Sequence, residues 1–205
     1  VRNYYPPDPT IDRIPGHWRW EDKWPIDRIE NHTWYAHMDH GLSNEPSENA
    51  IHTMVYKPSM GLEGGGRTMW WGDVTPDQRL MDEFSLVYDS ETLDAPLEIL
   101  GRPIAKLHVS ASATRANWVV RISDVAPDGQ VTQVAGAAFN GAHRISAREP
   151  SDIVPGDEFD LNIDLHFTSW VFPKDHRIRI AISNAQWPML WPTPMQMTST
   201  LTIGG

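Results

Sequence analysis

Prolines and glycines recur along the whole chain and leave little room for long helices. The 205 residues include 17 prolines and 14 glycines. A proline inside a helix removes a backbone hydrogen bond and clashes with the preceding turn, while a glycine there costs about 1 kcal/mol relative to alanine. Few segments can therefore hold a helix of ten or more residues, and we expect short strands joined by turns to dominate.

Apolar and polar residues alternate with a period of two in the second half of the chain, which is typical of strands with one buried face. The pattern covers residues 104–110, 118–125, 130–134, 159–167 and 176–183. Within 159–167 it places five apolar residues on one face: Phe159, Leu161, Ile163, Leu165 and Phe167. The segment Pro127-Asp128-Gly129 supplies a fixed φ, a side chain that bonds its own backbone and a position for positive φ, so it predicts a hairpin.

One-sided strands must bury their apolar faces against a second sheet. We therefore predict an all-β domain: a jelly-roll β-sandwich, galactose-binding-domain-like, over residues 31–205. A strand at 33–37 with a turn at 40–43 should open it. Residues 55–58 should be extended and lead into a glycine-rich connector at 61–66.

Residues 1–30 carry three tryptophans, Trp18, Trp20 and Trp24, among prolines and charged residues. This composition is too irregular for a helix and too aromatic for a disordered tail. We predict an extended lead-in that packs on another surface. The chain starts at Val1 without the basic and apolar stretches of a signal peptide, so we expect it to be a piece of a longer product.

Charge and cysteine content narrow the classes of partner and cofactor. Asp and Glu number 27 against 17 Lys and Arg, a net charge of −10, which repels polyphosphate and argues against nucleic acid. The absence of cysteine removes disulfides, thiol nucleophiles and cysteine zinc sites. No apolar run approaches the ~20 residues that a spanning helix needs, so we expect no membrane partner. We expect no cofactor, and a cytoplasmic location is favoured over secretion although the redox compartment is undetermined.

The motifs of common hydrolases and nucleotide-binding proteins are missing from these residues. No Gly-x-Ser-x-Gly elbow is present, and the nearest approach, around Ser59, lacks the first glycine, so we interpret Ser59 as a turn serine. The connector at 61–66 lacks the Gly-Lys-Ser/Thr of a phosphate loop. The acidic pairs at 82–83 and 157–158 are interpreted as surface charge. We predict no catalytic residue.

Histidines invite a metal hypothesis, because neutral imidazole is a common ligand. His32, His37 and His40 lie close in sequence with Asp39 beside them, but no zinc-binding spacing is present. A three-ligand site remains open. We favour solvated loop histidines and predict no metal site. His166 and His176 fall on the polar faces of predicted strands, so we expect them to be exposed.

Ten tryptophans are unusual for this length. Large aromatic side chains fill cores, anchor interfaces and line pockets, and we expect packing in the core or between segments to account for most of them. The segment 187–192 differs, because Pro188 and Pro192 prevent it from being a central strand, so its aromatics should project from a loop. The candidate pocket or interface residues are Trp187, Trp191, Trp18, Trp20 and Trp24.

Four segments in this order also carry a family resemblance: residues 17–25, residues 41–43 with 86–103, residues 122–129, and residues 176–184. Together they resemble the C-terminal region of the X-Pro dipeptidyl-peptidase and CocE/NonD hydrolases, a group that includes cocaine esterase and the α-amino acid ester hydrolases. The resemblance spans roughly residues 17–203. The region at Trp70-Trp71 and the histidines of 32–40 depart from it.

The resemblance implies an accessory role. In that family an α/β-hydrolase domain carries the catalytic Ser, Asp and His, and the jelly roll packs against it. Only the jelly roll is similar to this chain, so no triad residue transfers to any position here. The whole protein would then be a serine hydrolase of acyl esters or of proline-containing peptide bonds, and this piece alone should be inactive.

Two roles follow for the candidate residues. Trp18, Trp20 and Trp24 would dock on the catalytic domain or on a neighbouring copy, and the loop at 186–194 would help to wall the substrate pocket. Since many jelly rolls bind sugars and a fold does not choose a function, a carbohydrate-binding module and a homo-oligomerisation module remain alternatives.

Overall fold

The computed structural model describes residues 1–8, 10–62 and 76–204. Most of the predicted connector at 61–66, and the pair Trp70-Trp71, lie outside these residues. The described parts contain one short helix, α1 (Arg79–Asp82), and one 3₁₀ turn (Gly141–His143), and their other regular elements are strands. No helix in those parts is long and apolar enough to cross a membrane.

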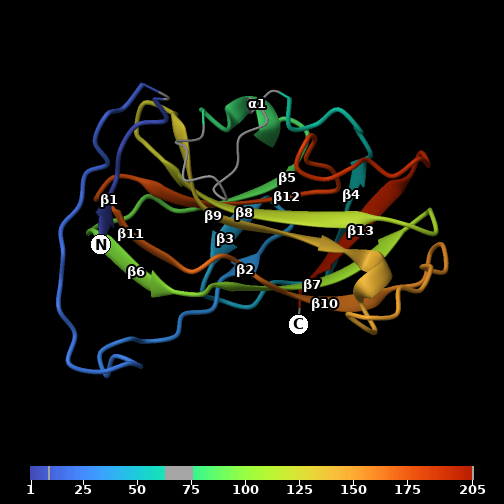
Figure 1. Ribbon diagram of the computed structural model, residues 1–205, viewed down its shortest axis with the longest axis horizontal. Helices are drawn as coiled ribbons and strands as arrows, with labels where there is room; N and C mark the ends of the chain where they lie inside the picture. Colours follow the sequence, from blue (N-terminus) through green and yellow to red (C-terminus); the bar gives the residue numbers. More distant parts are fainter. Residues whose placement is uncertain (9, 63–75, 205) are drawn as a thin grey trace.

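Three sheets make up the domain (Figure 1). Their strand orders are β2-β3-β5-β12-β8-β9, β10-β7-β13-β4 and β1-β11-β6. The strands are β1 (Arg2–Asn3), β2 (Tyr35–Ala36), β3 (Gly41–Ser43), β4 (Ala50–Val55), β5 (Leu86–Ser90), β6 (Leu97–Gly101), β7 (Ile104–Ala111), β8 (Asn117–Val125), β9 (Val131–Asn140), β10 (Phe159–Asp164), β11 (Thr168–Phe172), β12 (Arg177–Ser183) and β13 (Thr198–Ile203).

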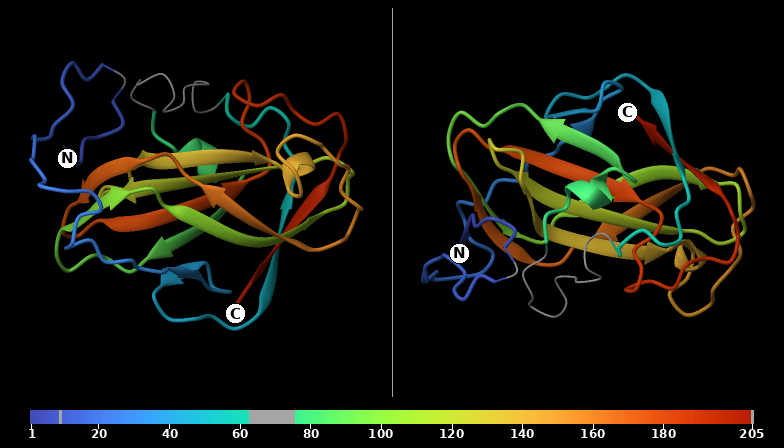
Figure 2. Two further views of the ribbon diagram at one scale, coloured as in Figure 1. Left: turned by 60° about the horizontal axis from the view of Figure 1, so that its bottom comes forward. Right: turned by 90° about the horizontal axis from the view of Figure 1, so that it is seen from above.

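The six-stranded and four-stranded sheets share one hydrophobic core, and Figure 2 shows their strands as stacked layers. Val109 and Leu161 enter it from the four-stranded sheet, and Val120 and Ile182 from the six-stranded sheet. Burying these faces removes apolar surface from water, which is the main favourable term in folding. The domain is therefore all-β and built as a β-sandwich, as predicted; the jelly-roll connectivity stays a prediction.

The predicted hairpin is confirmed. β8 pairs with β9 in antiparallel register from Val125↔Val131 to Asn117↔Asn140, with a bulge after Ile122. Gly129 takes the positive φ of +85° that the turn needs, and its amide donates to the Ala126 carbonyl at 2.8 Å. The alternation of the two strands and the chemistry of the turn between them therefore located this element.

β8 is buried on both faces, because the segment that includes α1 covers its outer side. Arg121 is 1% exposed and donates to Gln78 (3.0 Å), Asp82 (3.0 Å) and Ser85 (2.9 Å). Asp82 also accepts from Arg179 of β12 at 3.0 Å. The interpretation of Asp82 as surface charge is wrong: its carboxylate joins two arginines inside the protein.

His176, which we expected to be exposed, is also buried. Its Nδ1 lies 2.6 Å from Oδ1 of Asp124, and Oδ2 of Asp124 accepts from the indole N–H of Trp170 at 2.8 Å. The ring of Tyr4 covers His176 edge-on with 4.6 Å between centroids. Burial raises the pKa of Asp124, while the hydrogen bonds from Trp170 and His176 act in the opposite direction. The N-terminal segment covers His176 through Tyr4 and so accounts for its burial. The alternation within the strand around residue 176 gives no sign of this cover.

Replacing Asp124 with alanine tests this polar contact. The variant leaves the Trp170 indole N–H and the His176 Nδ1 without their acceptor in the core, and each orphaned buried polar group costs roughly 1–3 kcal/mol. We expect Asp124→Ala to lower the free energy of unfolding in urea by about 2–5 kcal/mol. Asp164→Ala, at an exposed position of β10, is the control and should change it by less than about 0.5 kcal/mol. Equal losses for both would contradict the account.

Candidate docking surface and aromatic hollow

Trp18 and Trp20 are almost completely exposed, at 99% and 96%. Arg19 between them reaches toward the body of the domain, where it pairs with Glu98 of β6 at 2.6 Å and with Glu21 at 2.6 Å. The two indoles on either side of it are left facing solvent. Two neighbouring indoles with no cover in the domain itself are unusual, because such side chains carry large apolar area.

The backbone that carries these tryptophans is tied down. The amino group of Val1 donates to the His17 carbonyl at 2.9 Å, and the His17 amide donates back to Val1 at 3.0 Å. Arg2 forms an isolated bridge with Gly16 and donates to Thr168 at 2.5 Å. Trp18 and Trp20 are therefore held at a defined place along the N-terminal segment, drawn in blue in Figure 1. Preordering of this kind lowers the entropic cost of binding.

Trp24 lies further along the same segment and is 61% exposed. Its ring is 5.8 Å from that of Phe167, which is itself 52% exposed. The prediction that Phe167 joins the inward face is wrong: the alternation continues beyond the end of β10 to the buried Leu165, but it stops before Phe167. We call Trp18, Trp20 and Trp24 the lead-in tryptophans.

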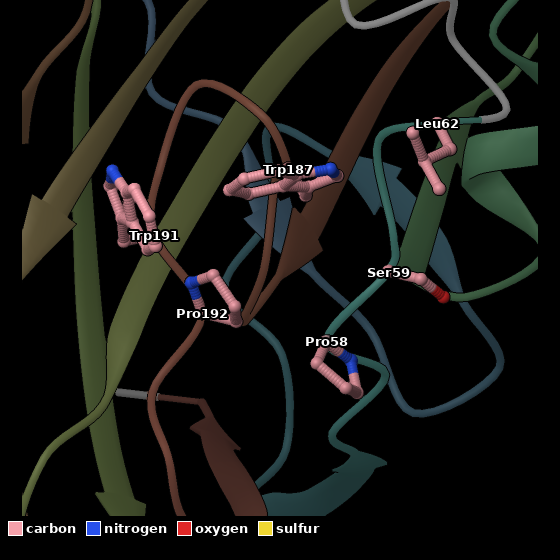
Figure 3. Close-up of a pocket in the computed structure, with 6 residues that line it drawn as sticks. All are labelled: Pro58, Ser59, Leu62, Trp187, Trp191 and Pro192. Atoms are coloured by element: carbon pink, nitrogen blue, oxygen red, sulfur yellow. The ribbon is translucent and has the colours of Figure 1, made fainter.

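The predicted loop tryptophans do come together. Trp187 and Trp191 meet edge to face, with 5.5 Å between ring centroids, and Trp191 is 81% exposed. They form one side of a hollow of about 310 Å³ (Figure 3). We call it the aromatic hollow; it is lined by Pro58, Ser59, Leu62, Trp187, Trp191 and Pro192.

The two loops of the hollow touch backbone to backbone. The Trp187 amide donates to the Met60 carbonyl at 2.6 Å. Gly61 has a φ of +116°, and a Cβ there would lie 2.7 Å from the Trp187 nitrogen and would overlap its carbonyl oxygen. Sequence reasoning found Trp187 and Trp191 but missed Pro58 and Leu62, since the loops are far apart in the chain. Gly61 is the one local signal in the sequence. The sequence does not show, however, that its missing Cβ makes room for the Trp187 backbone.

The described lining of the hollow holds no base beside Ser59. Ser59 lies in a turn closed by the Leu62 amide, which donates to its carbonyl at 3.3 Å. A serine attacks only when a neighbouring base takes its proton. Among the residues that the structure describes, the lining contains neither histidine nor carboxylate.

The histidines considered as metal ligands are not gathered into a site. His32 lies 3.9 Å from Glu30, the Nε2 of His37 is 2.8 Å from the Ser43 hydroxyl, and the Nδ1 of His40 is 3.0 Å from the Val87 carbonyl. Within residues 1–8, 10–62 and 76–204, no group of three His, Asp or Glu side chains could hold a metal ion.

Substituting Gly61 should separate close packing from backbone strain. Gly61→Ala places a methyl group against the Trp187 carbonyl, whereas Gly129→Ala, also at positive φ, meets open space. We expect about 1–2 kcal/mol of destabilisation for Gly129→Ala, the usual cost of a left-handed residue, and about 3 kcal/mol or more for Gly61→Ala. Urea denaturation measures both losses. A Gly61→Ala loss no larger than the control's would show that the loops do not pack as described.

Comparison with known proteins identifies the family to which the chain belongs. Residues 6–204 match the X-Pro dipeptidyl-peptidase C-terminal non-catalytic domain. Cocaine esterase from a Rhodococcus species is 30% identical over 186 residues, which cover 83% of this chain and 32% of the esterase. The chain spans about a third of the length of the curated relatives it matches.

Solved structures share the fold. An aminopeptidase from a marine sediment Thaumarchaeota archaeon superposes with a TM-score of 0.81 at 24% identity, over 92% of this chain and 37% of the aminopeptidase. An α-amino acid ester hydrolase superposes with a TM-score of 0.68 at 21% identity, over 83% of this chain and 33% of the hydrolase. Since the family match covers almost every residue, the chain belongs to the family of X-Pro dipeptidyl-peptidase C-terminal non-catalytic domains.

Proposed function

We propose that this domain supports a serine hydrolase of acyl esters or peptide bonds, of the X-Pro dipeptidyl-peptidase type, by packing on its α/β-hydrolase domain and helping to shape the substrate pocket. The observation that carries the proposal is the near-complete exposure of Trp18 and Trp20 on a tied backbone, in a domain whose relatives are about three times its length. The relative and the two solved structures named above are called an esterase, an aminopeptidase and an ester hydrolase.

The lead-in tryptophans supply the docking contact in this proposal. Exposed aromatic residues of this size are typical of interface hot spots, where each contributes about 2 kcal/mol or more once buried. The partner is the polypeptide that precedes residue 1 in the longer protein. The match to a C-terminal domain supports a partner that precedes it, and the Arg19–Glu98 pair leaves Trp18 and Trp20 facing outward.

The aromatic hollow supplies the pocket wall. In the part of the chain that the structure describes, the lining side chains are apolar apart from the Ser59 hydroxyl and the indole N–H groups, so the hollow suits an apolar or aromatic part of a substrate. The same composition disfavours the carbohydrate-binding alternative, because a sugar site needs several polar groups beside its aromatic platform to pair the sugar hydroxyls. The oligomerisation alternative would instead place the lead-in tryptophans against a second copy.

Removing two lead-in tryptophans tests docking. In the longer protein, we expect Trp18→Ala with Trp20→Ala to lower the midpoint of thermal unfolding and to split one transition into two, because the interface loses about 2 kcal/mol or more per indole. The same pair of changes in residues 1–205 alone should leave stability unchanged, since the indoles bury almost nothing there. Ile145→Ala, at a residue 76% exposed, is the control.

An unchanged unfolding profile of the longer protein would contradict docking. If the double variant instead lowers the molecular mass measured by sedimentation without altering the unfolding profile, the second-copy alternative is favoured.

Replacing Trp187 and Trp191 tests the pocket wall. In the longer protein we expect each alanine variant to lower kcat/KM about tenfold for esters with bulky apolar acyl groups, which corresponds to about 1.4 kcal/mol. Hydrolysis of a small acetyl ester should be unaffected. Ile145→Ala serves again as the control. Equal kcat/KM for wild type and both variants across the series would show that the hollow is not part of the substrate site.

A further inference from the structure

The hairpin of β2 and β3 is held to the rest of its sheet by few backbone contacts. β3 pairs with β5 at only two positions, Gly41↔Asp89 and Leu42↔Ser90. The Asp89 amide donates to the His40 carbonyl at 3.0 Å, just beyond that pairing. Side chains at this joint must therefore contribute much of the attachment.

Three aromatic rings from three elements stack at the joint. His40 of the hairpin turn lies on His52 of β4, with 4.5 Å between centroids and 15° between planes. His52 is in turn nearly parallel to Tyr88 of β5, at 5.7 Å and 12°. We call these three residues the histidine stack.

A hydrogen bond from a buried hydroxyl favours the neutral form of His52. The Tyr88 hydroxyl lies 2.7 Å from Nδ1 of His52, and Tyr88 is completely buried. Neutral His52 can accept the Tyr88 proton at Nδ1, whereas a protonated Nδ1 can only donate.

Adding a proton to His52 breaks this arrangement. A proton on Nδ1 would have to donate to the Tyr88 hydroxyl oxygen, so the hydroxyl would turn away and its own proton would lose this acceptor. Burial also raises the pKa of Tyr88, so the phenol does not ionise to pair with a charged His52. Burial first, and then the neighbouring His40, lower the pKa of His52, while the backbone of Met38 acts the other way. A charge on His52 would also lie next to His40, whose Nδ1 donates to the Val87 carbonyl at 3.0 Å.

The carboxylates of the adjoining elements are engaged elsewhere. In the hairpin, Asp39 accepts from the Gly41 amide at 2.9 Å, and His37 is bonded to Ser43. On β5, Asp89 is bonded by Arg179 of β12 at 2.6 Å. The residue opposite His52 on β13 is Leu201. In these described elements, no carboxylate is placed to compensate a charged His52.

We propose that the histidine stack is an acid-sensitive joint, which loosens the hairpin of β2 and β3 from β4 and β5 when His52 takes up a proton. A histidine that charges less readily in the folded state gives its full stabilisation above its unfolded pKa of about 6.5 and loses it as the pH falls toward the folded value. The hairpin directly follows the lead-in. On the proposed function, acid would therefore release one end of the segment that carries the docking tryptophans.

Hydrogen–deuterium exchange on the longer protein tests the joint without reference to docking. Peptides covering residues 35–43 and 86–90 are followed by mass spectrometry at pH 7.5 and 5.5, with times corrected for intrinsic exchange. We expect their protection to fall severalfold at pH 5.5, and by no more than about tenfold, because pH 5.5 lies about one unit below the unfolded pKa of histidine. Peptides of β8 should be unchanged.

Two variants and a control make the result decisive. In His52→Asn, the side-chain oxygen can still accept from Tyr88 but cannot titrate, so protection should be the same at both pH values. His40→Asn, which tolerates the φ of +67° at that position, removes the imidazole stacked on His52 and should weaken the response. His108→Asn, at an exposed histidine bonded to Asp160 on the outer face of β7, should keep the full response.

Equal protection of the wild type at both pH values would overturn the proposal. So would an acid response that persists unchanged in His52→Asn. Either result leaves the docking proposal intact, because neither measurement depends on the lead-in tryptophans.

Discussion

The buried carboxylate of Asp124 holds together parts of the domain that the sheets alone do not join. Asp124 lies on β8 of the six-stranded sheet and binds Trp170 on β11 of the three-stranded sheet as well as His176 beside β12. Both rings in turn pack against Tyr4 of the N-terminal segment. An unpaired carboxylate in this position would be costly, so its two donors are a condition of burial. Through them the sandwich fixes where the lead-in begins.

A second buried network attaches the segment around α1 to the six-stranded sheet. Arg121 and Arg179 project from neighbouring strands of the six-stranded sheet, and Asp82 binds both. Such a network contributes little net stability compared with apolar packing, but breaking one member leaves an uncompensated charge in the interior. It therefore fixes the place of residues 76–85 over the sheet more than it adds to the free energy of folding. At the other side of the domain, Gly61 and Trp187 fix the two loops of the aromatic hollow by direct backbone contact.

The sequence could predict the elements that follow from local rules. Alternation located β7, β10 and β12, and Pro127-Asp128-Gly129 located the hairpin of β8 and β9, because side-chain period and turn geometry are local properties. The burial of His176 was mispredicted, since it depends on Tyr4, which lies at the other end of the chain. The position of Asp124 could have been found: it shares the parity of Val120 and Ile122 in β8, which already indicated an inward carboxylate in need of partners.

The candidate site was predictable in the same way: its residues could be found from the sequence, but their neighbours in space could not. Composition singled out the tryptophans, and proline positions placed Trp187 and Trp191 in a loop, but which surfaces lie opposite them depends on contacts between distant segments. The histidine stack shows the limit clearly. Its members belong to a turn and two strands that are not adjacent in sequence, and only the folded sheet brings His40 onto His52.

The central claim is that a longer polypeptide covers the exposed indoles of the lead-in. Hydroxyl-radical footprinting with mass spectrometry measures this directly, by comparing oxidation of Trp18 and Trp20 in residues 1–205 alone and in the longer protein. The account predicts strong oxidation in the isolated domain and protection in the longer protein, with Met38, which is 73% exposed and lies outside both proposed surfaces, as an internal comparison. Equal oxidation of Trp18 and Trp20 in the two proteins would contradict it.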